Sequence, residues 1–276
     1  YSHLMRRLLN ANSAASSHRF DRHYACLLKT FEYWRVFTAA THREARTCLE
    51  ELTVATPGFA EAHALLTFMH LDEYRFGYNP VESPVPPLDR ALASARRGVQ
   101  LAPSSPRALQ ALIGALYVRS QFKDTRELIT KVLELNPLDT DMMADMGAKL
   151  IVMGEDALGA KLLAQSATAH PSPPPWHEFF QFLSLWYRGD DAGAARHAVR
   201  IDAPEYLLGL SAKLIAADAL NSQEERKLLV DTIMRMSPDF ALNPVPLLMR
   251  NMPDASLVAA FARDLRKAGL PVRPDV

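Results

Sequence analysis

Two short groups of side chains have residue types that could hold a metal ion. They are His18, Asp21 and His23, and Asp139, Asp141 and Asp145. A structural zinc site needs four ligands, and the first group has no fourth ligand near it. A calcium loop needs a glycine and a terminal glutamate at fixed positions, which the second group lacks. We therefore expect no metal site, and we interpret the aspartates as acids at the start of a helix, where they favour its dipole.

An aromatic stretch could in principle form a ligand-binding box. Its members are Trp176, Phe179, Phe180, Phe182, Trp186 and Tyr187. Apolar residues lie on almost every side of this predicted helix, which is typical of a helix buried between neighbours. The sequence also contains no phosphate-binding glycine loop, zinc-protease helix or nucleophile elbow. We expect core packing for the aromatic residues, no cofactor, and no enzymatic activity.

Charge and hydropathy exclude two classes of partner. Lysine plus arginine equals aspartate plus glutamate, 31 against 31, so no net field attracts nucleic acid or an anionic membrane. The longest apolar run, residues 207–220, is shorter than the roughly 20 residues that span a bilayer. We expect no direct nucleic-acid binding, no membrane insertion and a cytoplasmic location.

The two cysteines, Cys26 and Cys48, are too few for a disulfide framework, so we expect buried free thiols.

A proline recurs after apolar-rich segments along most of the chain. The positions are Pro57, Pro103, Pro137, Pro171, Pro204 and Pro238, with spacings of 46, 34, 34, 33 and 34 residues. A period of 34 is that of the tetratricopeptide repeat (TPR), a helical hairpin whose second helix ends near a proline. The first spacing carries an insertion of 12 residues, from about Phe76 to Pro87.

Other positions repeat with the prolines. Small residues stand where the two helices of a hairpin would approach closely, at Ala45, Ala91, Thr125, Gly159 and Ala194. Turn residues mark the hairpins at 120–124, 154–156 and 189–191. We expect an all-α, right-handed superhelical solenoid of about six hairpins and a C-terminal capping helix, forming one elongated domain. The predicted segments are a lead-in (1–19), repeats (20–57, 58–103, 104–137, 138–171, 172–204 and 205–238) and a capping segment (239–276).

The chain further resembles the C-terminal TPR region of bacterial class III adenylate or guanylate cyclases and of winged-helix transcriptional regulators. The segments that carry the resemblance are 24–28 (YACLL), 48–52 with Pro57, 60–66, 72–80 (DEYRFGYNP) and 265–271. The chain lacks an initiator methionine, and we expect it to be part of a longer protein. The resemblance implies that the chain is a regulatory domain of a larger signalling or transcription-regulating protein. Cyclase activity or DNA binding would then reside in other domains of that protein.

We therefore expect a non-catalytic binding scaffold whose partner is a protein, a peptide or another domain of the same protein. The proline-rich insertion is stiff, and we expect it to form a rim of the partner-binding surface. The predicted binding residues are Arg75, Phe76, Tyr78, Tyr117 and Arg119. The alternative for the loop is that it only packs on an adjacent hairpin. The alternatives for the whole chain are a small-ligand sensor and a homodimerisation scaffold built on the same helices.

Overall fold

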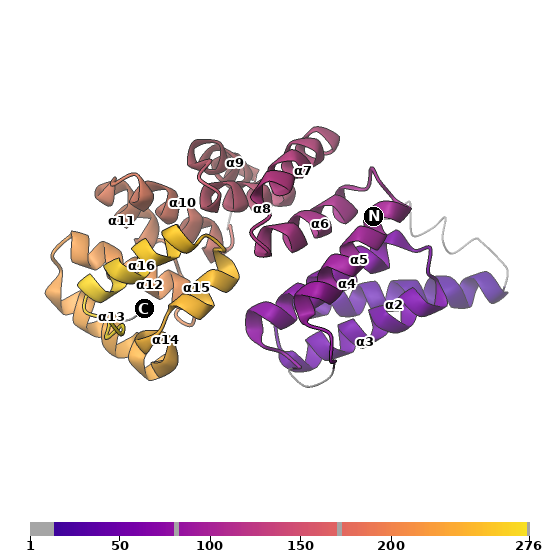
Figure 1. Cartoon of the computed structure of the whole chain (residues 1–276), viewed down its shortest axis with the longest axis horizontal. Coiled ribbons are helices and arrows are strands. Elements are labelled where there is room, and N and C mark those ends of the chain that lie inside the picture. The colour runs from indigo at the N-terminus through magenta and orange to yellow at the C-terminus, as the bar shows by residue number, and fades with distance from the viewer. Residues whose placement is uncertain (1–13, 80–82, 170–172, 275–276) are drawn as a thin grey trace. The chain divides into compact units, whose positions relative to one another are not determined.

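The computed structural model describes residues 14–79, 83–169 and 173–274, and every regular element in these ranges is a helix (Figure 1). In this part of the chain α2 to α13 follow one another as in six helical hairpins, of which α2–α3, α4–α5, α8–α9, α10–α11 and α12–α13 pack as contacting pairs, and three further helices follow. The bounds are α2 Ala14–Val36, α3 Ala39–Ala55, α4 Ala60–Phe76, α5 Pro87–Leu101, α6 Pro106–Val118, α7 Phe122–Leu135, α8 Thr140–Val152, α9 Asp156–Ala169, α10 Pro175–Tyr187, α11 Asp191–Val199, α12 Leu207–Ala219, α13 Gln223–Met236, α14 Pro238–Leu242, α15 Val245–Asn251 and α16 Ala255–Lys267. The all-helical hairpin fold predicted from the proline spacing is confirmed.

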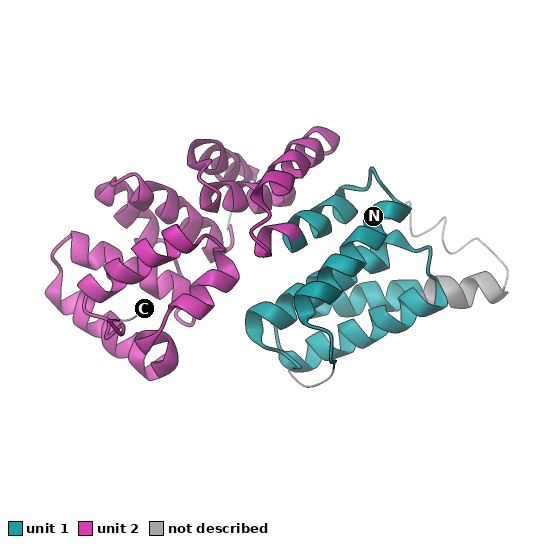
Figure 2. Ribbon diagram, in the orientation of Figure 1, with its two compact units in different colours: residues 1–115 teal, residues 116–276 magenta. Residues whose placement is uncertain are grey.

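The chain divides into two compact units, residues 1–115 and 116–276, where the sequence led us to expect one elongated domain (Figure 2). The division falls inside α6, whose last residues begin the second unit. Unit 1 contains α2 to α5 and most of α6, and unit 2 contains α7 to α16. The two units are described separately below.

The turns between the helices of a pair follow one geometry in unit 2. One residue in each turn adopts positive φ: Ser120 (57°), Gly154 (84°), Gly189 (75°) and Asn221 (57°). The residue after it returns a hydrogen bond to a carbonyl five residues back, as in Gln121 N to Leu116 O (3.0 Å) and Glu155 N to Leu150 O (2.8 Å). This is the Schellman type of helix ending, which favours glycine or asparagine. The turns predicted at 120, 154 and 189 are confirmed, and the one at Asn221 was not foreseen.

Small residues allow the paired helices to approach each other closely. A Cβ atom on Gly159 of α9 would lie 2.5 Å from the carbonyl oxygen of Gly147 on α8, so neither position has room for a side chain. Ala45, Ala91 and Thr125 are fully buried at the corresponding positions of α3, α5 and α7. The expectation that small residues mark close helix approaches is therefore confirmed.

The cysteines contradict our expectation of free thiols. Cys26 on α2 and Cys48 on α3 form a disulfide, with their Cα atoms 5.4 Å apart. Cys26 is fully buried in a core that includes Tyr33, Leu49 and Leu52. The two residues are 22 positions apart in sequence and face each other only because α2 and α3 fold into a hairpin. Their spacing alone could not show this.

Candidate partner-binding surfaces

Three aromatic side chains gather on the surface of unit 1, and we call Phe37, Phe76 and Tyr78 the aromatic cluster. The Phe37 and Phe76 ring centroids are 6.2 Å apart, and those of Phe76 and Tyr78 are 5.3 Å apart. Phe37 and Phe76 are each 50% exposed. The Tyr78 hydroxyl donates to the Phe37 carbonyl oxygen (3.2 Å). Phe37 directly follows α2 and Phe76 ends α4, so two helix ends and the loop after α4 position this cluster.

The loop after α4 is held by a buried ionic network. Glu73 on α4 is fully buried and accepts from Arg90 of α5 (2.5 Å) and pairs with Arg46 of α3 (3.1 Å). The Asn79 amide in the loop lies 3.4 Å from Glu73 Oε1 and 3.1 Å from His42 Nδ1. Burial alone would raise the pKa of Glu73, but the His70 hydrogen bond and the charges of Arg90 and Arg46 lower it to about 2. The described part of the loop therefore rests on the first two repeats through the hydrogen bonds of Asn79 to His42 and to the buried, charge-paired Glu73.

Asp72 is the second buried carboxylate of α4. It accepts a hydrogen bond from the Tyr33 hydroxyl (3.1 Å) and lies 3.6 Å from Arg75 Nη1. Burial raises the pKa of Asp72 to about 6, and the Arg75 charge and the Tyr33 hydrogen bond offset only part of this rise. Arg75 is thereby held beside Asp72, while 30% of its side chain stays exposed.

The five residues predicted as binding residues fall into both units. Arg75, Phe76 and Tyr78 lie together in unit 1, whereas Tyr117 and Arg119 belong to unit 2. Tyr117 is buried, and its hydroxyl donates to the Asn251 carbonyl oxygen (3.0 Å). Arg119, just after α6, is exposed. Our reasoning from sequence missed Phe37, whose only sequence signal is an aromatic residue at the end of a predicted helix.

In TPR hairpins the first helix of each pair lines the surface on which peptides are expected, and we call this surface of unit 2 its first-helix face. The chain's own C-terminal segment lies on it. Beyond the Tyr117 contact, Ser120 Oγ donates to the Pro253 carbonyl oxygen (2.8 Å), and Trp186 Nε1 of α10 donates to Asp264 of α16 (3.0 Å). Figure 1 shows α16 lying across α10 and α12.

The aromatic stretch of α10 makes the tightest part of this contact. Phe261 of α16 is fully buried, with its ring centroid 5.2 Å from Trp186 and 6.3 and 6.5 Å from Phe179 and Phe182. Phe179 and Phe182 are also fully buried, so the prediction of core packing is confirmed for them. The sequence predicted α16 as a cap on the last hairpin. The structure shows that it also packs against the first helix of the preceding pair.

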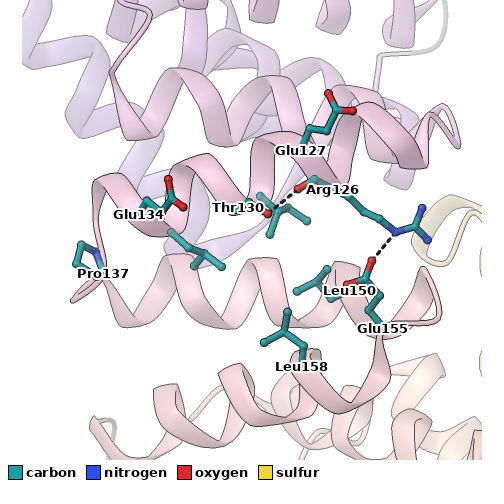
Figure 3. A pocket seen from close by; sticks show the side chains of 10 residues that line it. Arg126, Glu127, Thr130, Glu134, Pro137, Leu150, Glu155 and Leu158 are labelled. Atoms are coloured by element: carbon teal, nitrogen blue, oxygen red, sulfur yellow. Dashed lines mark hydrogen bonds and ion pairs between the residues drawn. The ribbon is translucent and has the colours of Figure 1, made fainter.

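A pocket of about 640 Å³ opens between α7 and α9 in unit 2 (Figure 3). Its apolar lining comes from Ile129, Leu133, Leu150 and Leu158. At one end Arg126 Nε lies 2.6 Å from Glu155 Oε1, and Arg126 Nη2 donates to the Met153 carbonyl oxygen (2.7 Å). The second helices of two repeats form its walls and α8 forms its floor, so the pocket is separate from the first-helix face.

Neither metal candidate forms a site in the described residues, where no group of three or more histidine, cysteine and acidic side chains could hold an ion. The side chains of His18 and Asp21 lie outside the described part of the structure. His23 stacks on Phe59 (4.5 Å between centroids). Asp139 caps α8 by accepting from Met142 N (2.9 Å), as expected for an acid at a helix start. Over the described ranges, no helix is long and apolar enough to cross a membrane.

Comparison with known proteins finds the same arrangement of helix pairs in solved structures. Pseudomonas aeruginosa PilF aligns over 80% of this chain and 95% of its own at 14% identity, with a TM-score of 0.56. PilW, a type IV pilus biogenesis factor, aligns over 78% and 94% at 17% identity, with a TM-score of 0.57. A tetratricopeptide repeat protein from Parabacteroides merdae aligns over 90% and 94% at 11% identity, with a TM-score of 0.52. The chain has the TPR fold. No protein-family model and no curated protein sequence matches it.

At these identities the structural likeness establishes the fold alone. The surfaces described above, rather than the likeness, carry the proposals that follow.

Proposed function

We propose that this TPR chain is a non-catalytic interaction or regulatory domain of a larger bacterial signalling or transcription-regulating protein. Its partner would be a protein, a peptide or another domain of the same protein. The aromatic cluster with Arg75 would form the contact surface of unit 1. In unit 2, exposed Arg119 would make a separate contact, whereas Tyr117 is buried and bonded to Asn251. The observation that carries this proposal is a pair of half-exposed rings, Phe37 and Phe76, in contact with each other and with partly buried Tyr78, whose hydroxyl is bonded to the Phe37 backbone.

Aromatic and arginine side chains are the types that dominate binding energy at protein interfaces. Here they are also pre-organised, because the Tyr78 hydroxyl is bonded to the Phe37 backbone and Arg75 is paired with Asp72. Side chains that are already fixed lose less entropy on binding, so more of the contact energy appears as affinity. A surface whose only role was to cover the core would gain nothing from half-exposed rings.

The proposal also concerns the longer protein that would contain this chain. The resemblance of segments 24–28 and 72–80 to cyclase-associated and winged-helix regulator repeats supports a signalling role. We expected a cytoplasmic location, whereas disulfides such as Cys26–Cys48 form and persist in oxidising environments. We therefore infer that this domain works in an oxidising compartment.

A second candidate function is homodimerisation through α2. Tyr24, Leu28 and Phe31 are each about half exposed and follow one helix face at spacings of four and three residues. Leu28 also lines a pocket of about 210 Å³ together with Lys29, Glu32 and Glu44, so charges of both signs adjoin the apolar stripe. A self-complementary contact between two copies would use such a surface. Light scattering over a concentration series distinguishes this function from partner binding.

The test of the leading proposal is site-specific photo-crosslinking in cells that produce the full-length parent protein. A photoreactive amino acid replaces Phe76, and the matched control replaces Val54, an apolar residue of unit 1 that is 80% exposed. We expect a defined crosslinked product from position 76 whose mass maps to a partner or another domain. Equal crosslinking from both positions, or none from position 76, would refute the proposal.

A further inference from the structure

The pocket between α7 and α9 contains apolar side chains that the described residues of unit 2 leave partly uncovered. Leu158 is 46% exposed although it lines the pocket beside buried Ile129 and Leu150. Leu133, which also lines the pocket, is partly exposed. The C-terminal segment, the element of unit 2 that covers the first helices, contacts α10 and α12 instead. Exposed apolar groups gathered around a cavity are typical of a binding surface.

The rim of this pocket carries more negative than positive charge. Glu127 and Glu134 are exposed on α7, and Figure 3 shows them on the helix above the apolar lining. They are seven residues apart, which places them on one side of the helix and about 10.5 Å apart along it. The single lining cation, Arg126, is already paired with Glu155. Lys131 does not line the pocket, but it lies four residues after Glu127 and three before Glu134, on the same side of α7. Three glutamates, Glu155 included, therefore face two cations at this rim.

We propose that this pocket binds a short amphipathic helix of a protein partner, with leucine-like side chains toward the pocket and lysine or arginine on the side that faces α7. The walls are themselves two helices, and a helix lying in a groove between helices is a recurrent mode of peptide recognition. The lining residues of α7 extend from Arg126 to Glu134, which corresponds to about 12 Å and about two helical turns. Basic residues seven apart on the partner would face Glu127 and Glu134.

This site is independent of the aromatic cluster, because all its residues belong to unit 2 and it lies on the second helices of its repeats. Failure of one proposal therefore leaves the other standing. The charge pattern separates the proposed partner from acidic peptides, which the same rim would repel.

The probe is a synthetic labelled peptide of about 14 residues with leucines at i, i+4, i+7 and i+11 and two lysines seven residues apart. The control peptide has glutamates in place of the two lysines. Binding to the whole chain is measured by fluorescence anisotropy. We expect micromolar binding of the lysine peptide, weakened at least about tenfold for the glutamate peptide.

Three variants test the assignment of the site. Leu158→Asp should weaken binding of the lysine peptide by about tenfold or more, whereas Leu228→Asp, at a 65% exposed leucine of α13, should leave it unchanged. The double variant Glu127→Lys/Glu134→Lys should reverse the preference between the two peptides. Leu158 and Leu228 are both exposed, so the circular dichroism spectrum and the melting temperature of each variant should stay close to those of the unsubstituted chain. No binding of the lysine peptide, equal binding of both peptides, or binding unaffected by Leu158→Asp overturns the proposal.

Discussion

Removing the Cys26–Cys48 disulfide should destabilise unit 1 selectively. The bond joins residues 22 positions apart, and the entropy that such a crosslink removes from the unfolded chain corresponds to about 3 kcal/mol at 25 °C. Cys26 is fully buried, so replacing both residues by alanine also removes some packing. Chemical reduction avoids that second contribution. We therefore expect the free energy of unfolding of unit 1 to fall by about 3 kcal/mol when the protein is unfolded in the presence of a phosphine reductant.

The three tryptophans allow each unit to be followed separately. Trp34 lies in unit 1, and Trp176 and Trp186 lie in unit 2. Urea unfolding of a Trp176→Phe/Trp186→Phe variant, followed by fluorescence, reports unit 1 through Trp34. Unfolding of a Trp34→Phe variant reports unit 2 and serves as the control. We expect the reductant to lower the midpoint for the first variant and to leave that of the second unchanged.

Two results would refute this reasoning. If the protein unfolded without reductant still reacts with two equivalents of a thiol reagent, the disulfide does not form in the native protein. If the disulfide is present but reduction leaves the Trp34 transition unchanged, α2 and α3 are held together by their packing alone. In that case the crosslink makes no contribution to the stability of unit 1.

Three further predictions concern other parts of the chain. Asp72→Asn should cost little stability at pH 5 and be neutral or stabilising at pH 8. The pKa of Asp72 is raised in the folded state, so its ionisation above about pH 6 lowers the free energy of unfolding. Urea unfolding of unit 1 at both pH values checks this. Phe261→Ala should lower the stability of unit 2 by about 3–5 kcal/mol, against less than about 0.5 kcal/mol for Leu228→Ala. Calorimetry measures both, and equal effects would contradict the packing of α16. Acidic C-terminal peptides should bind weakly or not at all, because Arg107 lies 3.9 Å from Glu61 and donates to Gln110; micromolar binding that Arg107→Ala abolishes would contradict this.

Sequence patterns predicted the helices and turns well because these depend on local chemistry. The proline period and the small residues at positions such as Gly159 identify the pairs, since each pair is one local unit. The position of α16 was predicted only in part. Its amphipathic pattern shows that one side is buried, but the pattern does not say against which helices. Contact with Trp186, far earlier in the chain, is a property of the tertiary fold.

The candidate surfaces were less predictable than the fold. A glutamate such as Glu73 is expected at the surface when only the sequence is known. The fold buries it and brings Arg46 of α3 and Arg90 of α5 to its carboxylate. The pocket between α7 and α9 has no motif, because its members are ordinary leucines, isoleucines and glutamates. The residue types near Phe76 suggested a binding surface, but the contribution of Phe37 depends on two helix ends meeting.

Hydrogen–deuterium exchange, compared between the chain alone and the same chain within its full-length parent, tests most directly the claim that the aromatic cluster of unit 1 contacts a protein partner. We predict slower exchange of the backbone amides at 37–39 and 77–79 in the parent, because a bound partner covers both segments. Exchange in α10 and α12 should be the same in both forms, since α16 covers these helices in each. Unchanged exchange at 37–39 and 77–79, with slower exchange confined to α10 and α12, would contradict the account.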